Sequence, residues 1–307
     1  MKNILLTGAN GYVGKYVLQE LLQRGYKVSG FIKRGMSIPN IENKNLQILK
    51  GDLLDKRSLN EALKGIDAVI HLAASVRIKS PKINYDVNVV GSKNLIDACI
   101  QKNVKRVIFT SSISVLRSRR GPYGETKYKA EKLFEKSNLD YTIFRPTLIY
   151  GVESQGIKNI VDYIQMFPCF IPLVGRGKYT RQPISVYDVA RVLVDCLDKK
   201  ETFRKIYPLA GQDILTFKKL IKMIAIEMNC NSKIMIPVPI ILCNLIAKFF
   251  EKTLAKPPFT SEHIRSLSED TQVDISQLVK YLNFKPIKLE QGIKELVKEL
   301  KKEGRIR

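Results

Sequence analysis

The sequence predicts an α/β fold, in which a doubly wound parallel sheet precedes a smaller C-terminal covering region. Two observations predict the sheet: short apolar runs alternate with helix-like segments, and the first run ends in a glycine-rich turn that leads into a helix. A third observation sets the boundary, because prolines and short apolar runs replace this alternation after Gly151. We therefore expect a sheet domain at 1–151 and a covering region at 152–307, interleaved with the last core elements.

The first strand and helix lie in "NILLTGANGYVGKYVLQELLQ". The run 4–6 is entirely apolar, which is typical of a strand buried on both faces, and apolar residues recur at helical spacing from Val13 onward. Gly8, Gly11 and Gly14 separate the two elements. Such a turn directs backbone N–H groups and the positive end of the helix toward one point, as a pyrophosphate requires. A tight turn without a ligand is the alternative.

The remaining elements follow in order. Five more strands are expected at 26–34, 45–55, 67–74, 104–112 and 141–151. Helices are expected at 58–66, with Ser58 as N-cap, and at 88–103 and 123–138. Beyond residue 151 we expect a helix at 187–197, a strand at 205–211 and a helix from Thr216.

Composition narrows the class of protein. The net charge is +23, which favours anionic partners, but the lysines are spread along the chain and no nucleic-acid-binding motif is present. We therefore expect a solvated basic surface and no nucleic-acid partner. The five cysteines form no CxxC pair and the two histidines join no cluster, which favours reduced thiols, a cytoplasmic location and no metal site. No signal peptide is expected.

The segment 233–250, "KIMIPVPIILCNLIAKFF", is strongly apolar. It is interrupted by Pro237, Pro239, Asn244 and Lys248. It also falls short of the ~20 apolar residues that a membrane-spanning helix needs. We expect a strand followed by a buried or partly exposed lid helix. Peripheral membrane contact is the alternative, with Lys248, Lys252 and Lys256 as the basic residues of a monotopic anchor.

The stretch "TSSISVLRSRRGPYGETKYKAE" carries the candidate chemistry. Ser111 and Ser112 end a strand, at the edge where doubly wound sheets bind ligands. Tyr123 and Lys127 lie four apart on one helix face. A nearby ammonium group and an oxidised nicotinamide would lower the pKa of the phenol. Tyr123 would then exchange a proton with a substrate oxygen that Ser112 also contacts. An ordinary amphipathic helix is the alternative.

These motifs together resemble the short-chain dehydrogenase/reductase superfamily, in its extended or atypical branch of NAD-dependent epimerases and dehydratases. The resemblance rests on "TGANGYVG", "GDLLD", "HLAA", "NVVGSKNLIDAC", "FTSSIS", "YGETK", "FRPTLIYG" and "ISVYDVARVLV" in this order. It implies a Rossmann fold, a small-molecule substrate such as a nucleotide sugar, and an NAD(P)-dependent oxidoreductase or epimerase that uses Tyr-Lys-Ser chemistry.

The resemblance also implies residue roles. The catalytic residues would be Tyr123, Lys127 and Ser112, with Ser111 as a second candidate for the serine. The pyrophosphate of the cofactor would contact Gly8, Asn10, Gly11, Tyr12, Val13 and Gly14. The adenosine would contact Asp52, Leu53, Leu72, Ala73 and Ala74. The central part of the cofactor would contact Thr110, Ser111, Tyr123 and Lys127, and the nicotinamide would contact Pro146 and Thr147. Asn88 would shape the site through the backbone.

The second strand bears on the choice of cofactor. An NAD enzyme usually offers an acidic residue there to bind the ribose diol. This chain instead has Lys33 and Arg34. Two cations suit a 2′-phosphate, so we expect NADP(H) in preference to NAD(H). Surface cations without a ligand are the alternative.

Three departures from the family pattern bear on the substrate. The segment between Ser112 and Tyr123 is short, as in atypical members related to an accessory subunit of respiratory complex I, and it holds three arginines: Arg117, Arg119 and Arg120. Leu148 stands where sugar-nucleotide enzymes carry asparagine, and Val152 where they carry proline. Conversely, Arg181 matches an arginine that grips a substrate diphosphate. We expect Arg181, with Arg117, to bind an anionic substrate; a surface arginine in a loop is the alternative.

Two hypotheses of different classes follow. In the first, the chain is an NAD(P)-dependent oxidoreductase or epimerase. In the second, it is a nucleotide-holding scaffold or redox sensor without turnover. The intact Tyr-x-x-x-Lys pair favours the enzyme, whereas the basic surface and the apolar C-terminal segment favour the scaffold. Because related folds pair through helices, a homodimer is a further expectation.

Overall fold

The computed structural model describes residues 2–38, 41–76, 80–254 and 259–306. The chain forms two compact units. The first comprises 1–146, 186–209 and 274–285, and the second comprises 147–185, 210–273 and 286–307. The boundary expected at residue 151 therefore lies inside the first segment of the second unit.

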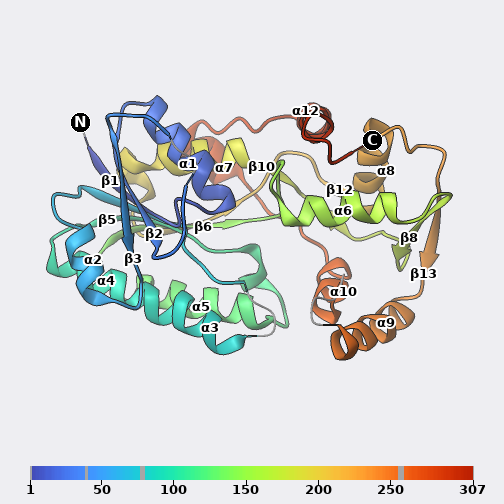
Figure 1. The fold of residues 1–307 in the computed structure, drawn as a ribbon, viewed down its shortest axis with the longest axis horizontal. Helices are drawn as coiled ribbons and strands as arrows, with labels where there is room; N and C mark the ends of the chain where they lie inside the picture. The colour runs from blue at the N-terminus through green and yellow to red at the C-terminus, as the bar shows by residue number, and fades with distance from the viewer. Residues whose placement is uncertain (1, 39–40, 77–79, 255–258, 307) are drawn as a thin grey trace. The chain divides into compact units, whose positions relative to one another are not determined.

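A seven-stranded sheet is the centre of the first unit (Figure 1). Its strands are β1 (Asn3–Thr7), β2 (Lys27–Lys33), β3 (Leu46–Gly51), β4 (Ala68–His71), β5 (Arg106–Thr110), β6 (Asp140–Pro146) and β11 (Lys205–Leu209). Their order is β11-β6-β5-β4-β1-β2-β3, and every pair is parallel. The predicted doubly wound fold is confirmed. The expected count of six strands is wrong, because β11, assigned from the sequence to the covering region, pairs with β6.

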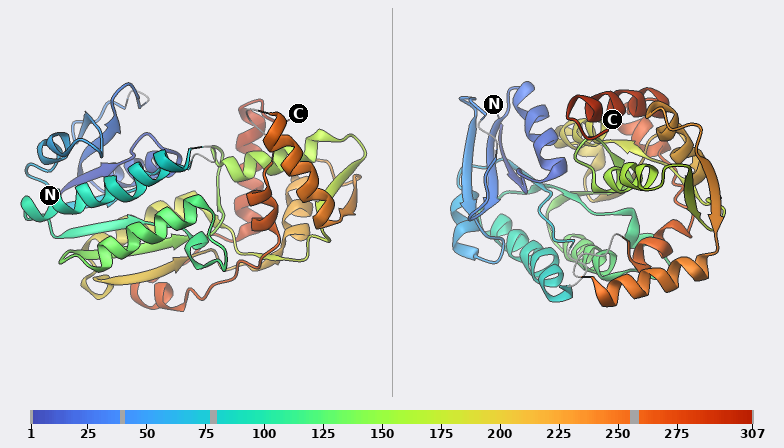
Figure 2. Two further views of the ribbon diagram at one scale, coloured as in Figure 1. Left: turned by 90° about the horizontal axis from the view of Figure 1, so that it is seen from below. Right: turned by 45° about the vertical axis from the view of Figure 1, so that its right-hand side comes forward.

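Helices cover both faces of this sheet (Figure 1). One face carries α1 (Tyr12–Gln23) and α7 (Val186–Asp195), which pack on each other. The other carries α2 (Lys56–Ala62), α4 (Gly91–Gln101) and α5 (Pro122–Glu135), and Figure 2 shows α4 and α5 side by side. Leu59, Leu95 and Phe134 join these three helices to the core and are fully buried.

Short helical segments complete the first unit. They are α3 (Pro81–Tyr85), a π-helical turn η1 (Asp86–Val90), α11 (Ser276–Leu282) and the 3-10 turns η2 (Ile113–Leu116), η3 (Cys196–Asp198) and η4 (Lys200–Thr202). The expected N-cap of α2 is wrong. Asp55 caps this helix by accepting from the N–H groups of Arg57 and Ser58, while the Ser58 hydroxyl donates to the carbonyl oxygens of Asp52 and Asp55.

The second unit is built around helices α6 (Gln155–Met166), α8 (Phe217–Glu227) and α12 (Leu289–Lys302). Their apolar faces share one core that includes Ile157, Ile164, Leu220 and Ile293. Three short strand pairs adjoin it: β7 (Ile149–Tyr150) with β10 (Ile184–Ser185), β9 (Thr180–Arg181) with β12 (Leu215–Thr216), and β8 (Phe170–Val174) with β13 (Ile234–Val238).

The apolar segment 233–250 forms the expected strand and helix, β13 and α9 (Ile240–Thr253). Helix α9 packs beside α10 (Ser261–Leu267), as Figures 1 and 2 show. None of the helices in the described ranges is long and apolar enough to span a membrane. Lys256, expected to help an anchor, lies outside the described residues.

Candidate dinucleotide and catalytic site

The glycine-rich turn after β1 is shaped by backbone contacts that exclude side chains. Gly8 has a φ of +73°, and a Cβ atom there would lie 2.8 Å from the Ala73 nitrogen. A Cβ atom at Gly14 would lie 2.0 Å from the Gly8 oxygen. Gly11 caps α1 without a side chain. The turn is therefore a cradle of bare backbone at a helix N-terminus, and these residues fit a dinucleotide pyrophosphate. Asn10 lies in this turn, and Tyr12 and Val13 open the helix.

The sheet order places this cradle at a topological switch point. Strand β1 pairs with β2 on one side and with β4 on the other, and ligands of open α/β sheets bind at the carboxyl ends of such strands. The segment after β4, 72–74, meets the turn directly, since the Ala73 N–H donates to Thr7 Oγ1 over 3.3 Å. Leu72 and Ala73 thus lie beside the cradle, and Ala74 follows them in the chain.

His71, at the end of β4, connects these loops through a buried chain of hydrogen bonds. Its Nδ1 lies 2.7 Å from Thr7 Oγ1 and its Nε2 3.1 Å from Ser92 Oγ. Ser92 Oγ donates to the Asn88 carbonyl oxygen over 2.6 Å, so Nε2 is the ring nitrogen that donates. Burial, aided by the charge of Lys127, lowers the pKa of His71 to about 3. The ring is therefore neutral, and its role was not predicted.

Asn88 lies in the π-helical turn and bridges the loop after β4 to helix α5. Its Oδ1 accepts from the Ser75 N–H over 2.7 Å, and its Nδ2 donates to Ser75 O and Thr126 Oγ1, each over 2.9 Å. Thr126 Oγ1 donates to the Tyr123 carbonyl oxygen over 2.8 Å. The loop after β4 is thereby joined to the first turn of α5.

The two cations after β2 lie close to acidic residues from the next loop. Lys33 Nζ is 3.7 Å from an Asp52 carboxylate oxygen, and an Arg34 guanidinium nitrogen is 3.1 Å from Asp55. The Lys33 and Arg34 side chains are two-thirds exposed. Although the chain has no carboxylate directly after β2, the fold therefore supplies one from Asp52. Leu53 beside it is buried and receives a hydrogen bond from Asn94 at its carbonyl oxygen.

Polar side chains gather where β5 ends. Ser112 caps the turn η2, and its Oγ accepts from both the N–H and the hydroxyl of Ser114, over 3.2 and 2.9 Å. These bonds occupy the acceptor side of Ser112 and leave its own hydrogen to be donated. Thr110 Oγ1 and Ser111 Oγ are buried and lack a partner among the described residues. Buried hydroxyls of this kind indicate a place for a ligand or water.

Helix α5 presents Tyr123 and Lys127 on successive turns. The Tyr123 side chain is half-buried, and burial raises its pKa to about 12. Lys127 is 2% exposed, with Nζ 4.1 Å from the centre of the Phe109 ring. Burial lowers the pKa of Lys127 to about 7, opposed by the charge of Glu131. The expected lowering of the tyrosine pKa by the lysine is therefore wrong for the protein alone, because desolvation dominates at both residues.

Glu131, one turn beyond Lys127, anchors the helix to β6. It is completely buried and forms a two-point ion pair with Arg145, over 2.6 and 3.0 Å. Such bidentate pairs fix geometry as well as charge. This ion pair was not predicted from the sequence, although the acidic residue four positions after Lys127 is a signal that could have indicated Glu131.

The arginines expected at the substrate are held in different ways. Arg181 is 5% exposed, and its guanidinium donates to the carbonyl oxygens of Glu269 and Ser266 over 2.8 and 3.0 Å. The alternative of a surface arginine is therefore wrong. Arg120 donates to Val115 O over 2.6 Å and stacks on Tyr128. Arg117 is half-exposed.

Two further expected residues, Pro146 and Thr147, and the departure from the family pattern at Leu148 lie near the division between the units in the sequence. Pro146 ends β6 in the first unit, and Thr147 begins the second, where its hydroxyl donates to Gln182 O over 2.5 Å. Leu148 packs against the core of the second unit.

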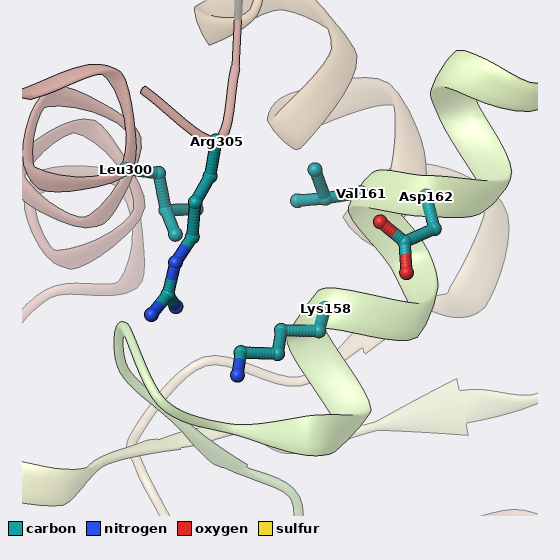
Figure 3. Close-up of a pocket in the computed structure, with 5 residues that line it drawn as sticks. All are labelled: Lys158, Val161, Asp162, Leu300 and Arg305. Atoms are coloured by element: carbon teal, nitrogen blue, oxygen red, sulfur yellow. The ribbon is translucent and has the colours of Figure 1, made fainter. Parts of the chain in front are cut away.

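The second unit contains a pocket. Its volume is about 210 Å³, and it is lined by Lys158, Val161, Asp162, Leu300 and Arg305 (Figure 3). Lys158 and Asp162 come from α6, and Leu300 from α12. None of the predicted site residues lines this pocket. Within the described ranges, His, Cys, Asp and Glu form no group of three or more that could hold a metal ion.

The sequence is similar to those of known proteins. Residues 8–200 match a family described as NAD(P)H-binding. The chain is 28% identical to UDP-glucose 4-epimerase of Vibrio cholerae over 96% of this chain and 94% of that protein. It is 26% identical to N-acetyl-alpha-D-glucosaminyl-diphospho-ditrans,octacis-undecaprenol 4-epimerase of Escherichia coli O157:H7, over 95% and 93%.

A solved structure agrees in fold. UDP-glucose 4-epimerase from Thermotoga maritima, determined with UDP-glucose, superposes with a TM-score of 0.77 at 21% identity, covering 98% of this chain and 99% of that one. The matched family and the full-length relatives make the chain an enzyme of the nicotinamide-dependent oxidoreductase and epimerase class. The chain belongs to the NAD(P)H-binding family, within the extended short-chain dehydrogenases/reductases that include the NAD-dependent epimerases.

Proposed function

We propose that the chain catalyses NAD(P)-dependent hydride transfer at a hydroxyl-bearing carbon of a sugar linked to a diphosphate. The observation that carries this proposal is the convergence of elements on one edge of the sheet. The glycine cradle ends β1, the capped Ser112 hydroxyl follows β5, and the Asn88–Thr126 bridge ties the start of α5 to the loop after β4. Tyr123 and Lys127 lie on that anchored helix.

Each polar residue has a definable task. When bound, the nicotinamide ring supplies a hydride acceptor or donor. Gly8, Gly11 and Gly14 would hold the pyrophosphate. Ser112 would donate its hydroxyl hydrogen to the reacting oxygen, and Tyr123 Oη would take or return the proton at that oxygen.

Lys127 would favour the phenolate of Tyr123. Because its pKa is about 7, a modest increase in nearby negative charge is enough to keep it protonated. The lysine charge and the positive charge of an oxidised nicotinamide would then both oppose the desolvation that raises the pKa of Tyr123.

The substrate class follows from two relatives whose names specify a sugar on a diphosphate. The carrier is a nucleoside in one and undecaprenol in the other. A net charge of +23 suits an anionic substrate. Arg181, whose guanidinium donates to the carbonyl oxygens of Glu269 and Ser266, is proposed together with Arg117 as a residue that binds this anionic substrate.

The test of the catalytic proposal is Tyr123→Phe, with Tyr128→Phe on the same helix as the matched control. Turnover of UDP-glucose, UDP-N-acetylglucosamine and the corresponding undecaprenyl diphosphate sugar is measured with each cofactor. We expect Tyr123→Phe to lose at least about 100-fold in kcat with cofactor affinity unchanged, and the control to retain both. Cofactor binding without turnover by the unmodified protein across this panel would overturn the proposed substrate class.

We propose NADP(H) as the preferred cofactor, with Lys33 and Arg34 on its 2′-phosphate. To bind the 2′-phosphate, Lys33 and Arg34 would have to break their ion pairs with Asp52 and Asp55. The preference for NADP(H) is therefore tested by titration with both cofactors. Fluorescence titration of Lys33→Ala/Arg34→Ala is expected to weaken NADPH binding by about tenfold or more and to leave NADH unchanged. Lys27→Ala, at the other end of β2, is the control. Tighter binding of NADH by the unmodified protein would overturn the preference.

We also propose that residues 152–307 cover the substrate. The cytoplasmic location and the homodimer remain predictions. Size-exclusion chromatography with light scattering tests the homodimer.

A further inference from the structure

Two consecutive elements of the second unit, strand β13 and helix α9, carry large apolar side chains that are strongly exposed. We call this set of residues the β13–α9 face. Its members and their exposed fractions are Ile234 (69%), Ile236 (44%), Ile241 (77%), Leu242 (47%), Leu245 (59%) and Phe249 (63%). Single exposed apolar residues are common, but four of these lie on one side of α9 by helical spacing, and such a group marks an interaction surface.

The geometry of α9 concentrates these residues on its outward side. Cys243 and Ala247, four apart, are its buried residues and pack with Val174 and Ile264. Ile241, Leu245 and Phe249 are also four apart, but half a turn away from that buried line. Because the inward line is occupied by small residues and the outward line by large apolar ones, the exposed side of the helix is the more hydrophobic.

The charges on α9 identify the partner. Lys248 and Lys252 are exposed and lie, by helical spacing, on the outward half of the helix with Ile241 and Leu245. The single acidic residue of the helix, Glu251, accepts hydrogen bonds from the N–H and hydroxyl of Ser261 over 2.8 and 3.1 Å. The outward half therefore combines large apolar side chains with two lysines, which is the pattern of an interfacial helix on an anionic bilayer.

We propose that the β13–α9 face docks peripherally on an anionic membrane surface, with the apolar side chains among the acyl chains and the two lysines at the headgroups. A second copy of the chain fits less well, since lysines are depleted from protein–protein interfaces and two such faces would bring four cations together. The net charge of +23 attracts the rest of the protein to the same surface.

Flotation with lipid vesicles tests this proposal on the full-length protein. Vesicles of phosphatidylcholine alone are compared with vesicles that also contain phosphatidylglycerol. We expect binding to the anionic vesicles, and a loss of at least about tenfold in vesicle affinity for Leu245→Glu/Phe249→Glu. Ile100→Glu/Val279→Glu, at residues 54% and 47% exposed on α4 and α11, is the matched control and should bind as the unmodified protein does.

A second pair isolates the electrostatic part. Lys248→Glu/Lys252→Glu should reduce binding to anionic vesicles more than Lys294→Glu/Lys298→Glu, an exposed pair on α12 with the same spacing and charge change. Equal losses for both pairs would mean that net charge alone drives binding, and would overturn the proposal. So would an absence of vesicle binding, or sedimentation showing a lipid-independent dimer that Leu245→Glu/Phe249→Glu abolishes. None of these readouts requires cofactor binding or turnover.

Discussion

His71 shows how a single residue without a catalytic role can organise a site. Its neutral ring receives a hydrogen bond from Thr7 and donates one to Ser92, and so connects the glycine turn to the helix that carries Asn88. The motif "HLAA" marks the position in the sequence, but a histidine at a strand end predicts neither a tautomer nor two hydroxyl partners. Those partners come from elements that the fold brings together.

The buried histidine predicts a pH dependence. Its pKa is about 3 in the folded state and ~6.5 when unfolded, so the unfolded chain binds more protons between these values. The stabilisation is therefore complete above pH ~6.5 and is lost as the pH falls, by up to about 1.4 kcal/mol per pH unit. Ring ¹⁵N NMR should show His71 as the neutral Nε2–H tautomer at pH 5; titration near pH 6.5 would contradict the buried network.

The three glycines of the turn differ as sites for mutation. A Cβ atom at Gly14 would collide with the backbone, whereas at Gly11 the nearest atom would be Gly8 O at 3.1 Å, and Gly11 is extended, with φ −73° and ψ 166°. Valine accepts that conformation. Gly11→Val should therefore change the free energy of unfolding by less than about 1 kcal/mol and weaken NADPH binding at least about tenfold, as measured by denaturation and fluorescence titration. Unchanged affinity in a folded variant would place the pyrophosphate elsewhere.

At the scale of elements, helix α5 depends on contacts at two places along its length. Its first turn is held by the Asn88–Thr126 bridge, and its third by the ion pair between Glu131 and Arg145. Removing one member of a buried pair leaves an uncompensated charge, which costs about 3–5 kcal/mol. We therefore expect this loss for Arg145→Met in chemical denaturation.

The same helix supplies the control for this prediction. Lys132 and Glu135 form a more exposed pair at 2.7 Å, so Lys132→Met should cost less than about 1 kcal/mol. Glu131→Gln/Arg145→Met should recover part of the loss, because no buried charge then remains. Equal costs for Arg145→Met and Lys132→Met would show that the buried pair does not anchor α5.

The elements also show what the sequence could predict. Continuous apolar runs such as 4–6 identify buried parallel strands, and the spacing of Tyr123 and Lys127 places them on one helix face. The position of β11 could not be predicted, because its residues show where a strand occurs but not which sheet edge it joins. The cap of α2 depends on which of two nearby side chains, Asp55 or Ser58, reaches the free N–H groups, and local preference allows both. The contact between the Asp52 carboxylate and Lys33 could not be predicted either, because it depends on the pairing of β2 with β3.

At the scale of the molecule, neither compact unit is a continuous stretch of chain. The first unit also contains the segments 186–209 and 274–285, which follow the first segment of the second unit in the sequence. The returning segment supplies α7, whose Val189, Val192 and Leu193 are buried, and it supplies β11, which completes the sheet beside β6. The glycine cradle therefore lies on a sheet that the first 151 residues do not complete.

This interleaving predicts the behaviour of a fragment comprising residues 1–151. Without α7 the face of the sheet that carries α1 loses its second helix, and without β11 the strand β6 becomes an open edge with unpaired backbone groups. We expect the fragment to show no cooperative thermal transition and no NADPH binding, whereas the full chain shows both in calorimetry and fluorescence titration. A fragment that melts cooperatively and binds NADPH would show that α7 and β11 are dispensable, and that the sheet domain ends where the sequence pattern alone placed it.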